Sequence, residues 1–129
     1  MYEVSAKFCI SAAHLLRNYE GKCSNLHGHN WDVTVSLNGE RLDGRGMLVD
    51  FGVLKGFFAH IKNEFDHRFF NETPYFSDKN PTAENISKYI FDKISELLLQ
   101  AGITNAKVAR VSVFETQNCE AVYYRSPEL

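Results

Sequence analysis

Apolar and polar side chains alternate from the second residue of the chain to His14. Because successive side chains of an extended strand point to opposite faces, this pattern predicts a half-buried strand over residues 2–14. His14 has the parity of the apolar side chains, so it should point toward the core; the alternative is a core histidine that bonds only to backbone. The apolar positions are Tyr2, Val4, Ala6, Phe8, Ile10 and Ala12.

A second alternation begins at His27 and ends at the turn signal Asn38-Gly39. It predicts a second strand, preceded by a loop over residues 17–24. His27 and His29 share the parity of its apolar positions, so the two imidazoles should lie side by side on one face. Those apolar positions are Trp31, Val33, Val35 and Leu37.

Two further stretches carry apolar residues at helical spacings of three and four. The first helix would follow Asp50, which can cap it. The second would follow Asn80-Pro81-Thr82, where Asn80 or Thr82 can act as the cap, and Gly102 would end it. Both stripes are predicted to face the core; they are Leu54, Phe57, Phe58, Ile61 and Phe65, then Ile86, Ile90, Ile94, Leu97 and Leu98.

Shorter strands complete the pattern. A return strand is predicted over residues 47–49, and strands over 107–115 and 121–125 would form a hairpin through the connection 116–119. Strands that are separated from paired helices, without alternation of the two, indicate one α+β domain over residues 1–129. Its antiparallel sheet should carry two helices on one face, and its edges could be covered by neighbouring subunits.

Composition narrows the function classes. The chain has 129 residues, a formal net charge of −2 and a pI of about 6.2, which argues against non-specific binding to nucleic acid or to an anionic membrane. No apolar run approaches membrane-spanning length, and no signal-peptide pattern is visible. Three cysteines form a sparse, odd set that favours free thiols in a reducing cytoplasm.

The segment from Cys23 to Trp31 concentrates groups that can bind a metal ion. His27 and His29 can chelate one ion from a strand face, and His14 ends the strand before them. Three histidines with an open fourth position are typical of a catalytic zinc site. Cys23 could instead close the site as a fourth ligand, which would make it structural, or act as a base or nucleophile beside the metal. Without a metal, His27 and His29 would simply be surface histidines that flank a turn glycine.

Two other positions suggest chemistry. Asp66-His67, at the predicted exit of the first helix, could act as a general acid/base pair, because a carboxylate raises the basicity of an imidazole. The alternative is a helix-end histidine that interacts with the helix dipole. Glu115, at the end of a strand, could accept two hydrogen bonds from the guanidine-like edge of a pterin or guanine ring, or simply be solvated.

Six short motifs occur in one order along nearly the whole chain. They are Ser-Ala-Ala-His ending at His14, Cys23-x-x-x-His27-Gly-His29, Asp50-Phe51, Asp66-His67, Pro81-Thr82-Ala-Glu84-Asn85 and Val113-Phe-Glu115-Thr116. In this order they resemble the 6-pyruvoyl-tetrahydropterin synthase family, and within it the bacterial carboxy branch of queuosine biosynthesis. The resemblance implies a tunnelling-type fold (T-fold), in which antiparallel sheets of several subunits join into a barrel with the helices outside, as trimers or hexamers.

The resemblance also assigns roles to residues. It implies Zn²⁺ at His14, His27 and His29. It implies Cys23 as the proton-transfer residue, assisted by Asp66 and His67. It implies Glu115 as the pterin anchor, with Thr82 nearby.

The implied reaction is that of a zinc-dependent lyase. It converts 7,8-dihydroneopterin triphosphate to 6-carboxy-5,6,7,8-tetrahydropterin and releases acetaldehyde and triphosphate. The alternative within the family is the pyruvoyl product, formed without carbon–carbon cleavage; a non-enzymatic zinc-stabilised binding module is the alternative from another class. One departure concerns the triphosphate: the family often has a basic residue after the first zinc histidine, where this chain has Leu15 and its nearest basic residue is Arg17. Another is Phe65, which replaces the usual leucine before Asp66-His67.

Overall fold

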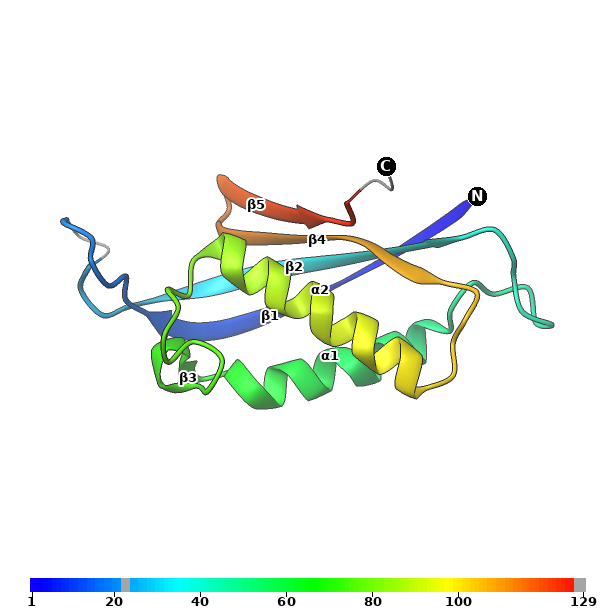
Figure 1. The fold of residues 1–129 in the computed structure, drawn as a ribbon, viewed down its shortest axis with the longest axis horizontal. Helices are drawn as coiled ribbons and strands as arrows, with labels where there is room; N and C mark the ends of the chain where they lie inside the picture. The colour runs from blue at the N-terminus through cyan, green and yellow to red at the C-terminus, as the bar shows by residue number, and fades with distance from the viewer. Residues whose placement is uncertain (22–23, 127–129) are drawn as a thin grey trace.

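The computed structural model describes residues 1–21 and 24–126. Its five-stranded sheet has the order β3-β1-β2-β4-β5, and two helices cover one face (Figure 1). This arrangement confirms the predicted α+β class. In chain order the elements are β1 (Tyr2–His14), β2 (His27–Gly39), α1 (Phe51–Phe65), β3 (Arg68–Phe69), the 3-10 helix η2 (Phe70–Glu72), α2 (Ala83–Gln100), β4 (Lys107–Thr116) and β5 (Cys119–Tyr124).

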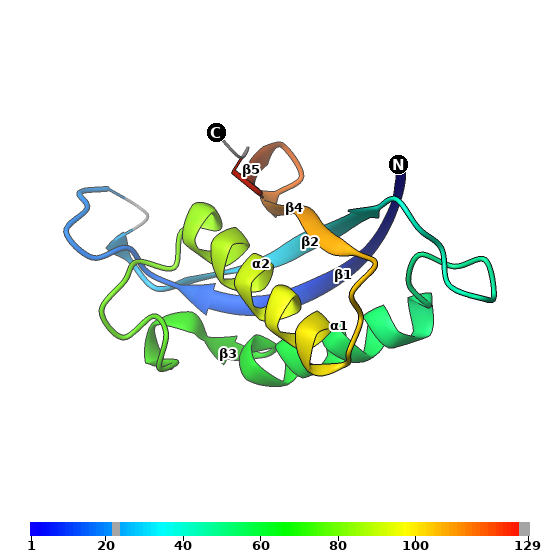
Figure 2. The same ribbon diagram turned by 45° about the vertical axis from the view of Figure 1, so that its right-hand side comes forward.

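The core lies between the sheet and the helices. Helix α1 packs on β1, and α2 packs on β4 and β5, so that both helices lie on the same side of the sheet in two views (Figures 1 and 2). The parity predicted from the sequence is the one that is buried, because the apolar positions of β1 and β2 face the helices. The fully buried apolar side chains of these two strands are Ile10, Trp31, Val33, Val35 and Leu37.

Both predicted helices form, and their caps explain where they begin. The Asp50 carboxylate accepts a hydrogen bond from the Gly52 N–H at 2.7 Å. At the second helix the cap is Thr82, whose hydroxyl accepts from the Asn85 N–H, and not Asn80. Gly102 ends α2 with a φ of +72°, a left-handed conformation that suits glycine. Within the described part of the chain, neither helix is long and apolar enough to cross a membrane.

Two details of the sheet differ from the prediction. Residues 47–49 are not a strand: Met47 closes a loop on Asp43, donating its N–H to the carboxylate and accepting from the Asp43 N–H. The structure also contains a strand that was not predicted, β3. It pairs with β1 in parallel, so the sheet is not purely antiparallel. Two residues are too short to show an alternating pattern, and their pairing depends on contacts distant in sequence. The last strand begins at Cys119, two residues earlier than predicted.

The Asp50 cap gives a stability prediction. Asp50→Ala should lower the free energy of unfolding by about 1 kcal/mol, because the first turn of α1 loses its side-chain acceptor. Denaturant titration of both proteins measures this change. Asp78→Ala is the matched control, since exposed Asp78 contacts only Lys79 among the ion pairs of the described residues. Equal destabilisation by the two variants would show that the cap contributes nothing of its own.

Candidate functional site

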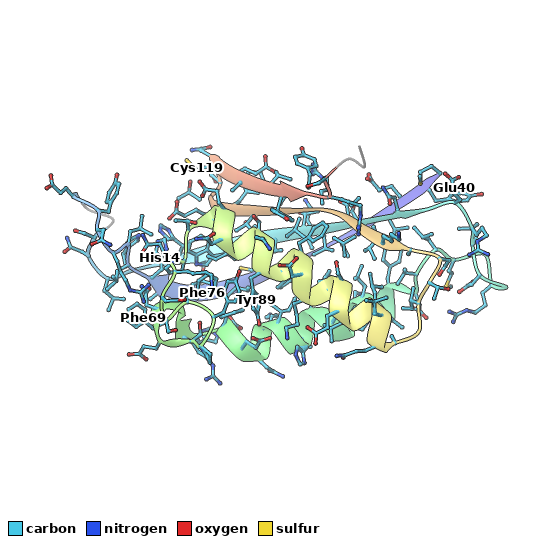
Figure 3. The ribbon with its side chains drawn as sticks, viewed as in Figure 1. His14, Glu40, Phe69, Phe76, Tyr89 and Cys119 are labelled. Atoms are coloured by element: carbon cyan, nitrogen blue, oxygen red, sulfur yellow. The ribbon has the colours of Figure 1, made fainter. Side chains whose placement is uncertain are left out.

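Three histidines meet at one end of the sheet. In the antiparallel pairing of β1 with β2, His14 lies opposite His27, and Ala12 lies opposite His29. All three share the parity of the buried positions of their strands, and His14 lies beside the start of α2 (Figure 3). The Nε2 atoms of His14 and His27 are 2.9 Å apart, and the His29 ring centroid lies 5.2 Å from that of His14. The two strands therefore bring together the three residues predicted to bind a metal.

Glu115 joins this group from β4. Its Oε1 lies 3.2 Å from His14 Nε2 and 3.3 Å from His29 Nε2. The four candidate ligand atoms all lie within 4.8 Å of one another. Nothing in the local sequence places Glu115 beside the histidines; the cause is the pairing of β2 with β4, in which Val33 lies opposite Val113.

Hydrogen bonds to backbone orient two of the imidazoles. His14 Nδ1 lies 2.8 Å from the Pro81 carbonyl oxygen, and His27 Nδ1 lies 2.7 Å from that of Asn25. Because a carbonyl can only accept, both Nδ1 atoms carry the proton. In the neutral rings both Nε2 atoms then present lone pairs to each other, which favours a cation between them.

Burial favours the neutral form of two of the imidazoles, His14 and His29. Burial lowers the pKa of His14, which is 1% exposed; the Pro81 hydrogen bond and Glu115 oppose the shift, and His27 and His29 add to it. Burial also lowers the pKa of His29, against the opposing effect of Glu115. Neutral imidazole is the form that binds metal ions.

The donor set fits a metal ion. His29 Nε2 is buried without a hydrogen-bond partner in the described residues, although Glu115 Oε1 is nearby. Two ligand atoms held by one tetrahedral ion at about 2.0–2.1 Å would lie about 3.3 Å apart. The 2.9 Å between the Nε2 atoms of His14 and His27 is near this value, and Glu115 Oε1 lies at 3.2 and 3.3 Å from the Nε2 atoms of His14 and His29. An ion at the centre of the cluster would satisfy every one of these nitrogen atoms.

Trp31 supports the cluster, although the sequence analysis treated it only as a core residue. Its ring meets those of His14 and His29 edge to face, with centroids 4.9 and 5.2 Å apart. The indole N–H donates to the Ala12 carbonyl at 3.1 Å. The position of Trp31 two residues after His29 was the available signal, because residues two apart share a strand face.

Asp66 and His67 lie at the exit of α1, as predicted, but outside the cluster. Asp66 accepts a hydrogen bond from the Ser11 N–H, and His67 adopts a left-handed φ of +59°. The His67 side chain is 82% exposed, and its Nε2 lies 3.7 Å from Asp66 Oδ2. His67 and His29 line one broad pocket of about 1160 Å³. This shared pocket connects Asp66-His67 to the histidine cluster.

Of the two remaining predicted site residues, the structure describes Thr82 but not Cys23. Thr82 caps α2 and directly follows Pro81, whose carbonyl holds His14, so it adjoins the cluster through the backbone. Its role toward a substrate stays a prediction. Cys23 lies outside the described residues.

Comparison with known proteins agrees with the fold and with the motifs. The family model described as 6-pyruvoyl tetrahydropterin synthase matches residues 3–126. The 6-carboxy-5,6,7,8-tetrahydropterin synthase of Synechocystis is 36% identical, over 100% of this chain and 97% of that protein. The human 6-pyruvoyl tetrahydrobiopterin synthase is 33% identical, over 94% and 90%.

A solved structure carries the same fold. The 6-pyruvoyl tetrahydropterin synthase of Caenorhabditis elegans superposes with a TM-score of 0.84 at 27% identity, over 97% of this chain and 96% of that one. This likeness confirms the predicted tunnelling-type domain. Together with the match over almost the whole sequence, it shows that the chain belongs to the 6-pyruvoyl tetrahydropterin synthase family.

Proposed function

We propose that the protein is a zinc-dependent lyase that converts 7,8-dihydroneopterin triphosphate to 6-carboxy-5,6,7,8-tetrahydropterin, with release of acetaldehyde and triphosphate. The observation that carries the proposal is the close approach of the Nε2 atoms of His14 and His27, 2.9 Å apart and beside His29 and Glu115. The proposal of a pterin compound is supported by the names of the relatives, which are pterin synthases. The place in queuosine biosynthesis that we propose follows from the resemblance of the sequence motifs.

His14, His27 and His29 would hold the ion. When bound, Zn²⁺ supplies Lewis acidity toward an oxygen of the substrate side chain. The protein provides the orientation: the carbonyls of Pro81 and Asn25 fix the tautomers of His14 and His27, and Trp31 packs against two of the rings. Burial of His14 keeps water away from one side of the site.

Glu115 would anchor the pterin ring. Its side chain is 31% exposed, so the carboxylate can be reached from solvent while it borders the histidines. A carboxylate accepts two parallel hydrogen bonds from an N–H and an amino group, the edge that a pterin presents. The short distance from Glu115 to His14 and His29 would bring the ring close to the ion, as a reaction on the adjacent side chain requires.

Proton transfer would involve His67, Asp66 and Cys23. The exposed His67 Nε2 can take or give a proton at the pocket that it shares with His29. Asp66 Oδ2 lies 3.7 Å from this nitrogen. Cys23, four residues before His27, is assigned proton transfer because its motif resembles that of the family.

We also propose a homo-oligomer in the cytoplasm. The edge strand β5 ends in an exposed Tyr124, and a sheet edge of this kind can pair with another subunit. The three sparse cysteines support a reducing compartment.

Incubation with 7,8-dihydroneopterin triphosphate, followed by mass spectrometry of all products, tests the reaction. The proposal predicts carboxytetrahydropterin, acetaldehyde and triphosphate in equal amounts. The pyruvoyl product without acetaldehyde would favour the alternative within the family. No turnover by the zinc-loaded protein would favour a binding module.

A substitution at Glu115 tests the anchor. Glu115→Gln should weaken the binding of neopterin by about 1.5–3 kcal/mol, because the amide loses the charge and one acceptor. Fluorescence titration measures the dissociation constant, and zinc content should stay at the wild-type level. Glu120→Gln, on the neighbouring strand β5, is the matched control. Unchanged affinity for neopterin in Glu115→Gln would rule out the anchoring role.

A further inference from the structure

Two asparagine side chains join the segment after β1 (residues 15–17) to η2 and to the loop between η2 and α2. Asn71 bonds Leu15 twice, accepting from its N–H and donating to its carbonyl, each at 3.0 Å. Asn80 bonds Arg17 in the same way, at 2.8 and 3.0 Å. The loop passes the end of β1 in both views (Figures 1 and 2). Each asparagine side-chain amide bonds both the N–H and the carbonyl of one residue, as a backbone partner would. These paired bonds fix the spacing between the two segments.

The Arg17 guanidinium strengthens this junction, by which we mean the contacts of residues 15–17 with residues 71–80. Nη1 donates to the Lys79 carbonyl at 2.8 Å, and Nη2 donates to the Phe76 carbonyl at 2.9 Å. A longer contact of 3.4 Å joins Nη2 to the Asn71 carbonyl. Among the described residues, no carboxylate forms an ion pair with Arg17. Both terminal nitrogens of Arg17 are thus engaged by backbone carbonyls, which holds the loop together.

The junction continues to His14. Asn80 is followed by Pro81, whose carbonyl accepts the hydrogen bond from His14 Nδ1 at 2.8 Å. The Asn80 carbonyl is fixed from the other side, by the Thr82 N–H at 2.9 Å and the Asn85 amide at 2.8 Å. The Pro81 carbonyl is thus placed between one group of contacts from Arg17 and another from the first turn of α2.

We infer that Arg17 is a positioning residue for the metal site: through Lys79 and Asn80 it holds the Pro81 carbonyl against His14, and it is not a contact for the triphosphate. This inference rests on the proposed function for the identity of the metal and of the anion. A metal-binding histidine that donates its second N–H to a carbonyl is fixed in tautomer and ring orientation. The family pattern often has a basic residue directly after the first histidine; this chain has Leu15 there, and its nearest basic residue, Arg17, follows His14 by three residues.

Variants of Arg17 separate the two roles. In Arg17→Ala the zinc dissociation constant, measured by competition with a chromophoric chelator, should rise about 10-fold or more, the scale on which outer partners of metal ligands act. Arg17→Lys should fall between this variant and wild type, because one ammonium cannot reproduce the planar fork. The absorption bands of bound Co²⁺ should shift in Arg17→Ala, whereas affinity for inorganic triphosphate should stay unchanged.

The control is Arg45→Ala, at the opposite end of the sheet, where Arg45 pairs with exposed Asp43 and Asp50. It should leave zinc affinity and the Co²⁺ spectrum at wild-type values. Should Arg17→Ala fail to fold, Arg17→Lys and Asn80→Ala take its place, with the same expected direction.

Three outcomes would overturn the inference. Wild-type zinc affinity in folded Arg17 and Asn80 variants would show that the junction does not position His14, and would leave the proposed lyase intact. Loss of triphosphate affinity with unchanged zinc affinity would make Arg17 a phosphate contact. A wild-type protein that binds no zinc would contradict the proposed function itself, and this inference with it.

Discussion

His27→Ala should lose zinc and turnover together. The three imidazoles supply all the nitrogen ligands of the cluster, and His27 Nε2 lies 2.9 Å from His14 Nε2, so its removal opens one side of the site. Losing a ligand itself should cost more than the 10- to 100-fold in affinity that is lost with an outer partner of a ligand. Metal analysis after gel filtration, together with the product assay, measures both effects.

His60→Ala is the matched control for this result. His60 is exposed on α1 and reaches only Glu64, 3.7 Å away, among the ion pairs of the described residues. Its removal should leave zinc content and turnover unchanged. A His27→Ala protein that kept full zinc content would show that the ligand assignment is wrong.

Cys23→Ala should keep zinc and lose activity. Three histidines would form a competent site without the thiol, and Glu115 would still bind the ring, so the variant should bind neopterin with unchanged affinity. Turnover should fall about 100-fold or more, the usual scale for loss of a positioned acid or base. Cys9→Ala, which removes an exposed thiol from β1, should have no such effect.

The opposite result would have a clear meaning. If Cys23 is a fourth ligand, Cys23→Ala should lose zinc affinity and also stability, because structural zinc contributes free energy of folding. A zinc-free or unfolded variant would therefore overturn the assignment of proton transfer to Cys23, and with it much of the case for an enzyme.

The sequence was sufficient to predict how His14, His27 and His29 are grouped. The alternation of two long strands places each residue on a face, and the three histidines share the buried parity. The helices were equally predictable, because their stripes are long and Asp50 and Gly102 mark their ends. Elements with such local, periodic patterns can be predicted because they depend little on contacts with distant residues.

The rest of the site depends on pairing between distant segments. Glu115 reaches the histidines only because β4 pairs with β2. The local sequence of a strand does not indicate which other strand it pairs with. Arg17 meets Lys79, 62 residues away, through backbone carbonyls that any residue type provides. For the same reason β3 was missed, and residues 47–49 were wrongly predicted as a strand that the Asp43 loop replaces.

X-ray absorption at the zinc edge tests the central claim most directly. The protein should be loaded with one Zn²⁺ per chain and measured with and without neopterin. An open site held by His14, His27 and His29 predicts three nitrogen neighbours, one or more oxygen neighbours, and no sulfur, with a change in the oxygen shell when neopterin binds. A sulfur neighbour at about 2.3 Å and a spectrum insensitive to neopterin would indicate a closed structural site and contradict the account.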